Sequence, residues 1–236
     1  SMFEFQNFLK PFLLAMGLFC VPLLIWVAIN LARKKKDHTH IEYWIFSNAE
    51  VLPDQNEIAD ILFARNPFSK AERPLSPADG LLMSDIRLDV SLVLKDKNPH
   101  VFRPDLFSEI CDPTPESLQG LANATSIIKV RYISEPKLKN DSHLVMITHM
   151  TNAYLTVSGG CLVYDMIAEK LILAENFAAE AQLGTNPTNF DAHVQIRWLP
   201  GEGNYGYVVT AGLKKVGLKE LKSDPTPNDR RVLVCE

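Results

Sequence analysis

PFLLAMGLFCVPLLIWVAINLA is the stretch from Pro11 to Ala32, and it contains no charged residue. At about 1.5 Å per residue, a helix of this length covers the roughly 30 Å hydrocarbon core of a bilayer. A cleaved signal peptide fits less well, because its apolar segment is shorter and its basic residues precede that segment. The stretch predicts one transmembrane helix over residues 11–32, with residues 1–10 as a short N-terminal flank.

Four basic residues follow the apolar stretch at once: Arg33, Lys34, Lys35 and Lys36. Lys10 is the only basic residue before it. Because cytoplasmic flanks carry the excess of lysine and arginine, this asymmetry predicts a single-pass membrane protein with its N-terminus outside and its C-terminal domain in the cytoplasm. We expect the four basic residues and Trp26 to contact membrane lipid.

The rest of the chain divides into a basic juxtamembrane connector, residues 33–40, and one soluble domain, residues 41–236, a size that suits a single domain. The whole chain has a net charge of −4, but residues 1–36 hold five basic side chains and one acidic one, so the remainder carries −8. This acidity argues against general nucleic-acid binding, which requires a clustered positive surface. The four cysteines are far apart without a C-x-x-C pair, which predicts neither a disulfide framework nor a zinc site.

Hydrophobic periodicity predicts both strands and helices in this domain. Alternating or β-branched runs predict strands over 41–46, 86–94, 127–133, 161–164, 193–198, 205–210 and 230–235. Helical spacing and capping residues predict helices over 54–65, 115–124, 142–157 and 174–182, the second capped by Thr114 and the third by Ser142. Residues 66–80 carry three prolines and read as a surface loop. The sum is an α+β domain with a mainly antiparallel sheet and packed helices.

The string GEGNYG, residues 201–206, matches the dinucleotide-binding pattern G-x-G-x-x-G letter by letter. That pattern needs a strand before it and a helix after it, so that a phosphate meets the helix N-terminus. Here a proline precedes the string and a strand-like segment follows it. A hairpin turn is the better interpretation, and we expect no cofactor.

Acid–base chemistry has one candidate pair, His149 on the third predicted helix and Asp165 after the next strand. An imidazole oriented by a carboxylate can act as a general base. A membrane-tethered hydrolase or transferase using this pair is therefore an alternative, although no recognised catalytic string accompanies it. A buried polar network explains the same residues with fewer assumptions. His143 and His149 are six residues apart on one helix, which is not metal-site spacing, and His38-x-His40 would lie on one side of an extended segment but lacks a third and a fourth ligand, so we expect no metal.

A local basic patch occurs near the C-terminus, at Lys214, Lys215, Lys219 and Lys222. It reads as a solvated face or as a surface that docks on an acidic partner or on lipid. Together with the absence of catalytic motifs, these features favour a non-catalytic single-pass subunit whose cytoplasmic domain docks on other membrane protein subunits and stabilises a larger complex. A regulatory domain that senses a small ligand is a further alternative.

Overall fold

The computed structural model describes residues 39–64, 85–111, 113–136 and 138–230. The chain divides into two units, residues 1–36 and 37–236, and every described residue belongs to the second. The predicted transmembrane helix, the connector up to His38 and the proline-rich loop at 66–80 lie outside the described residues. The expected α+β domain with an antiparallel sheet and packed helices is confirmed.

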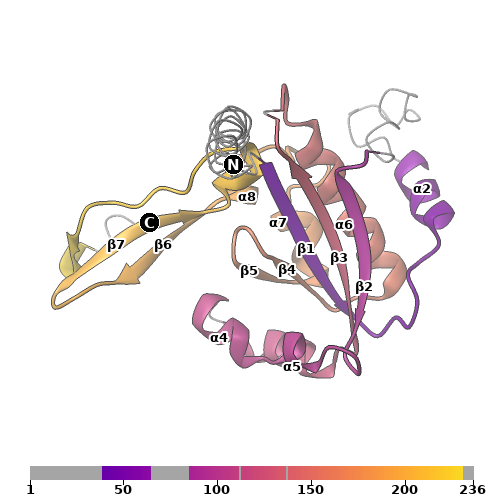
Figure 1. The fold of residues 1–236 in the computed structure, drawn as a ribbon, viewed down its shortest axis with the longest axis horizontal. Coiled ribbons are helices and arrows are strands. Elements are labelled where there is room, and N and C mark those ends of the chain that lie inside the picture. The colour runs from indigo at the N-terminus through magenta and orange to yellow at the C-terminus, as the bar shows by residue number, and fades with distance from the viewer. Residues whose placement is uncertain (1–38, 65–84, 112, 137, 231–236) are drawn as a thin grey trace, which may run out of the picture. The chain divides into compact units, whose positions relative to one another are not determined.

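Eight strands and several helices make up the described chain (Figure 1). The strands are β1 (Thr39–Ser47), β2 (Leu88–Leu94), β3 (Ser126–Ser134), β4 (Leu162–Asp165), β5 (Lys170–Leu173), β6 (Gln195–Pro200), β7 (Tyr205–Ala211) and β8 (Thr226–Pro227). The α-helices are α2 (Gln55–Ala64), α4 (Asp105–Cys111), α5 (Pro115–Asn123), α6 (Ser142–Ser158), α7 (Ala174–Glu180) and α8 (Phe190–His193). Short 3-10 helices are η1 (Pro99–Phe102), η2 (Leu213–Val216) and η3 (Asn228–Arg230).

The main sheet has five antiparallel strands in the order β2-β3-β1-β4-β5. The first strand of the chain therefore becomes the central one. In the chain order β1-α2-β2-η1-α4-α5-β3-α6-β4, helices α2 and α6 each connect two strands that are not neighbours, which is a split β-α-β arrangement. Strand β5 extends the sheet beyond β4 by a short hairpin.

The inner face of the main sheet carries the larger core. Alternation along β1 directs Ile41, Tyr43 and Ile45 to this face, where they are buried against α6, α2 and α7. In Figure 1, α6 lies behind β1 and β3. Almost every residue of α6 from His143 to Leu155 is buried, so this helix occupies the centre of the core. The helix ends at Ser158, one residue beyond the predicted end at 157, and Gly159 caps it in a left-handed conformation.

The outer face of the sheet is covered at one end only. There Phe46 and Ile127 pack with Phe102, Phe107 and Leu121, which come from η1, α4 and α5. Perpendicular ring contacts join Phe46 to both other phenylalanines, at 6.4 and 5.8 Å between centroids. The Thr114 hydroxyl accepts a bond from the Ser117 amide and caps α5, as predicted. At its other end the same face carries polar and charged side chains.

The second sheet is a hairpin with a short addition, in the order β6-β7-β8. Figure 1 shows β6 and β7 to one side of the main sheet, with α8 at their base. The turn between them is the GEGNYG string, which confirms the hairpin interpretation. The Trp198 ring lies over Gly206, where a Cβ atom would approach it to 2.3 Å. A glycine at position 206 is therefore required for the indole to lie flat on the ribbon.

Two local predictions were wrong, and two elements were missed. Strand β5 and helix α8 were not predicted, and His193 belongs to α8, whereas the alternation placed it in a strand. The reason is a helical turn closed by a bond from the Val194 amide to the Phe190 carbonyl, 2.8 Å long. Ser142 is the first residue of α6 and does not cap it; the Asn140 side chain instead accepts a bond from its amide.

Gly212 connects the hairpin to η2 in a conformation that other residues avoid. Its φ is +119°, and a Cβ atom there would lie 2.0 Å from the His193 carbonyl oxygen. Gly203 also has a positive φ, +62°, but a Cβ atom there meets nothing within 4 Å. Replacing Gly203 by another residue therefore costs only the strain of a left-handed backbone, whereas replacing Gly212 costs that strain and a steric clash.

We predict that Gly203→Ala lowers the free energy of unfolding by about 1 kcal/mol, the strain of a left-handed residue. Gly212→Ala should lower it by about 3 kcal/mol or more, since backbone atoms must move apart. Urea unfolding of the full chain in detergent, followed by tryptophan fluorescence, measures both. Equal losses for the two variants would contradict the clash described at Gly212.

Candidate functional site

A buried cluster of ionisable side chains lies where η2 meets the main sheet. Lys215 is 0% exposed, and Asp165 and Tyr43 are 2% exposed each. The Lys215 ammonium group forms an ion pair with Asp165 at the end of β4. It also donates a bond to the Tyr43 hydroxyl on β1, with 3.4 Å between Nζ and Oη. The cluster therefore joins three segments that are far apart in the sequence.

The local backbone explains why Lys215 points inward while Lys214 is exposed. Glycines with left-handed conformations, Gly212 and Gly217, bound η2 on both sides and allow it to turn sharply. Within η2, Leu213 and Lys215 are buried. Asp165 is prepared for its partner by an Asx-type turn, because its Oδ1 atom accepts bonds from the amides of Ile167 and Ala168, at 3.2 and 3.0 Å.

The charges of this cluster stabilise one another. Burial lowers the pKa of Lys215, but the carboxylate of Asp165 and the Tyr43 hydroxyl raise it more, so that the pKa lies above its ordinary value. Lys215 is thus a cation at neutral pH, and a protonated amine is not a nucleophile. Burial also raises the pKa of Tyr43, which keeps its hydroxyl protonated. The arrangement is suited to holding segments together and offers no proton acceptor to a substrate.

Two buried histidines flank the cluster. The Nε2 atom of His143 lies 2.8 Å from the Lys215 carbonyl oxygen, and that of His193 lies 2.6 Å from the Pro187 carbonyl oxygen. A carbonyl oxygen only accepts, so both Nε2 atoms carry the proton. Among the described residues, neither Nδ1 atom has a hydrogen-bond partner. Burial lowers the pKa of both imidazoles, and the nearby Lys215 charge helps to lower that of His193 to about 4.

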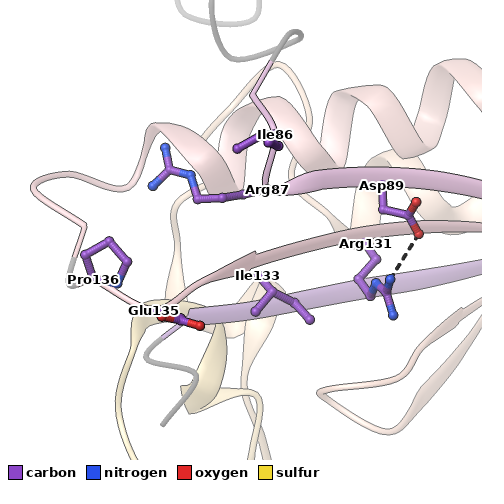
Figure 2. A pocket seen from close by; sticks show the side chains of 7 residues that line it. All are labelled: Ile86, Arg87, Asp89, Arg131, Ile133, Glu135 and Pro136. Carbon is purple, nitrogen blue, oxygen red and sulfur yellow. Dashed lines mark hydrogen bonds and ion pairs between the residues drawn. The ribbon is translucent and has the colours of Figure 1, made fainter. Parts of the chain in front are cut away.

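A separate, open site lies on the outer face of the main sheet, near the β2 edge. Figure 2 shows this pocket, of about 380 Å³, whose lining residues are Ile86, Arg87, Asp89, Arg131, Ile133, Glu135 and Pro136. Asp89 and Arg131 face each other across β2 and β3 with 3.2 Å between nitrogen and oxygen. Arg87 points away from them in Figure 2 and binds Asp85. An ion pair as exposed as that of Asp89 and Arg131 contributes little to folding stability.

Next to this pocket, β1 presents His40, Glu42 and Trp44 on the same outer face. Glu42 accepts bonds from both neighbours, at 3.0 Å from His40 Nε2 and 2.7 Å from the indole nitrogen of Trp44. Burial raises the pKa of Glu42, but these bonds and the charges of His40 and Lys129 lower it below its ordinary value. The Lys129 ammonium group lies 4.1 Å from the centre of the Trp44 ring. The i, i+2 spacing of H-x-E-x-W in a strand was the signal that could have identified this network.

The residues of the predicted catalytic pair have different surroundings. His149 is half-buried on α6 and takes part in an interaction of its own. Both oxygens of Asp165 are occupied, by Lys215 and by the turn amides. The histidine whose pKa is influenced by Asp165 is His193. The proposed roles of His149 and Asp165 in catalysis stay a prediction.

The predicted basic patch needs a correction. Lys214, Lys219 and Lys222 are exposed, as a contact surface requires. Lys215 is wholly buried and does not belong to this surface, because the ion pair with Asp165 directs its side chain inward. The proposed lipid contacts at Trp26, Arg33, Lys34, Lys35 and Lys36 lie outside the described residues.

Removing the charge of Lys215 leaves Asp165 buried without a partner. We predict that Lys215→Met lowers the free energy of unfolding by about 3 to 5 kcal/mol. The double variant Lys215→Met/Asp165→Asn should lose less than the single one, since no charge then remains in the interior. Lys214→Met, at the exposed neighbour, is the matched control and should change it by less than about 0.5 kcal/mol. A double variant less stable than Lys215→Met would contradict this account of the pair.

Acid should unfold the protein partly through His193. Its pKa is about 4 in the folded chain and near 6.5 in the unfolded one, so the unfolded chain binds the proton more tightly. The contribution of neutral His193 to the free energy of unfolding is fully present above pH 6.5. It is lost as the pH falls to 4, which lowers the free energy of unfolding by about 3 kcal/mol. We predict that the free energy of unfolding of His193→Gln, measured with urea across this pH range, falls by about 3 kcal/mol less than that of the unchanged chain. Parallel curves for the two proteins would contradict the assignment.

Comparison with protein-family models, with curated proteins and with solved structures gave no match. Within the described part of the chain, no three histidine, cysteine or acidic side chains gather as metal ligands do. None of the described helices combines the length and the apolar character that crossing a bilayer requires. The function therefore has to be argued from the surfaces and the buried cluster described above.

Proposed function

We propose that this chain is a non-catalytic, single-pass membrane subunit whose cytoplasmic α+β domain docks on other membrane protein subunits and stabilises their assembly. The membrane part of the proposal is supported by the uncharged run at 11–32 and by the four basic residues that follow it. The docking part is supported by the β6–β7 hairpin, whose outer strand carries exposed apolar side chains.

Strand β6 is the single observation that carries the docking proposal. It is an edge strand, and in the part of the chain that the structure describes only β7 pairs with it. Ile196 is 59% exposed and Leu199 is 39% exposed, one on each face of the ribbon. An edge that combines unpaired backbone groups with apolar side chains is suited to a strand or a surface of another protein.

The other residues of β6 are held by the domain itself. Arg197 forms an ion pair with Glu169 in the turn between β4 and β5. Trp198 packs over Gly206 of the neighbouring strand. Because these contacts orient the ribbon before any partner binds, docking costs little ordering of the hairpin. A pre-ordered, apolar edge is what a stable subunit contact requires.

Native gel electrophoresis of gently solubilised membranes tests the proposal. The full chain should migrate in a species much larger than the 26.5 kDa monomer in its micelle. Ile196→Lys/Leu199→Lys should move it to the monomer position, because two charges at the apolar edge oppose docking. Val51→Lys/Ile61→Lys is the matched control, since these residues are exposed to 73% and 39% and lie elsewhere.

Two results would contradict the proposal at different points. If alkaline carbonate extracts the chain from membranes, the proposal that residues 11–32 anchor it there is wrong. If the chain is retained in membranes but migrates as a lone monomer, the proposed docking role of β6 is wrong. The same holds if the two pairs of lysine substitutions change its migration equally.

A further inference from the structure

The segment from Lys214 to Lys222 presents basic and apolar side chains alternately to the solvent. Lys214, Lys219 and Lys222 are exposed, and between them Leu218 is 54% and Leu221 is 64% exposed. We call these five residues the basic edge. Single exposed leucines are common on protein surfaces. Two strongly exposed leucines within four residues are typical of a surface that contacts something other than water.

The acidic residue of this segment is turned away from the surface. The Glu220 carboxylate accepts bonds from the amides of Gly212 and Lys214, at 3.0 and 3.2 Å, and from the Thr210 hydroxyl, at 2.9 Å. Its charge is thus used to hold the segment against the hairpin. Within an acidic domain, the basic edge therefore offers three cations without a competing carboxylate from its own segment.

The segment is also fixed in place. The Thr210 amide donates to the Leu221 carbonyl at 3.0 Å, and the Leu221 amide donates to the Thr210 hydroxyl at 2.8 Å. The segment thus runs along the side of β7 that faces away from β6. The basic edge and the proposed docking edge lie on opposite sides of the hairpin, so both can be occupied at once.

The contacts of Lys215 connect the segment that carries the basic edge to β1, the first strand of the domain. Lys215, within the same segment, is bonded to Tyr43, which lies four residues, about 13 Å, from the start of β1 at Thr39. Only two residues separate Thr39 from the last of the four consecutive basic residues. At about 3.5 Å per residue, this connection spans about 10 Å. So short a connection limits how far the start of β1 can lie from the end of the basic run.

We propose that the basic edge rests on anionic phospholipid headgroups of the same bilayer, with Leu218 and Leu221 entering the interface between them. This proposal rests on the membrane span in the proposed function. Lysines beside an anionic leaflet bind its headgroups electrostatically, and interleaved leucines add apolar burial. Because the β6 edge lies on the opposite side of the hairpin, this contact leaves it free for another subunit.

A photo-crosslinking amino acid at position 221 of the full chain tests the contact. The chain is reconstituted in vesicles of phosphatidylcholine, with or without phosphatidylglycerol, and adducts are identified by mass spectrometry. We expect a phospholipid adduct that is at least about fivefold more abundant in the anionic vesicles, the gain that one lysine near a charged leaflet provides. The same probe at Val51, which is also exposed, should give no adduct above background.

The variant Lys214→Gln/Lys219→Gln/Lys222→Gln should reduce the adduct at position 221 to its level in phosphatidylcholine alone. Lys97→Gln/Lys139→Gln, at two exposed lysines elsewhere, should leave it unchanged. An equal yield in both vesicles, no lipid adduct, or a protein adduct in native membranes would overturn the proposal; the last result would favour an acidic protein partner. These results apply to a chain retained after carbonate extraction, whereas loss on extraction would overturn the proposed function itself.

Discussion

The ion pair between Lys215 and Asp165 is the interaction on which the position of the C-terminal third depends. It connects η2 to β4 beneath the central strand, and Tyr43 adds a bond from β1. Replacing such a pair by apolar residues often costs little, so its main contribution is to select one arrangement. Here it holds Lys215, which the turn between Gly212 and Gly217 directs inward, in one position in the core. The orientation of the hairpin and of the segment along β7 follows from that selection.

The two faces of the main sheet have different roles because their side chains differ in kind. The inner face is apolar and holds α6, with almost no polar group apart from the cluster at its margin. The outer face is apolar at one end and carries His40, Glu42 and Trp44 at the other. In the interior, burial lowers the pKa of His143 and His193 and raises that of Tyr43. Exposed groups, such as Asp89 and Arg131, pair with each other.

Local patterns predicted the elements well and the buried cluster poorly. The alternation in β1 and β3 and the Thr114 cap are short-range signals, and the structure confirms them. Lys215 could not be distinguished from Lys214 by periodicity, because the left-handed glycines at 212 and 217 decide which one turns inward. Its partner lies fifty positions earlier in the chain, and no local pattern records such a distance. The only available signal was the pair of glycines in GLKKVGLKEL.

The central place of β1 in the sheet has a consequence for biosynthesis. This strand is synthesised before its neighbours β3 and β4, which come about 80 and 120 residues later. The contact between Lys215 and Tyr43 joins two residues that are 172 positions apart in the sequence. Contacts of such long range fold slowly, and an unpaired central strand is exposed to aggregation while it waits. Until β3 and β4 have been synthesised, the backbone groups of β1 therefore lack the partners that they bond in the folded sheet.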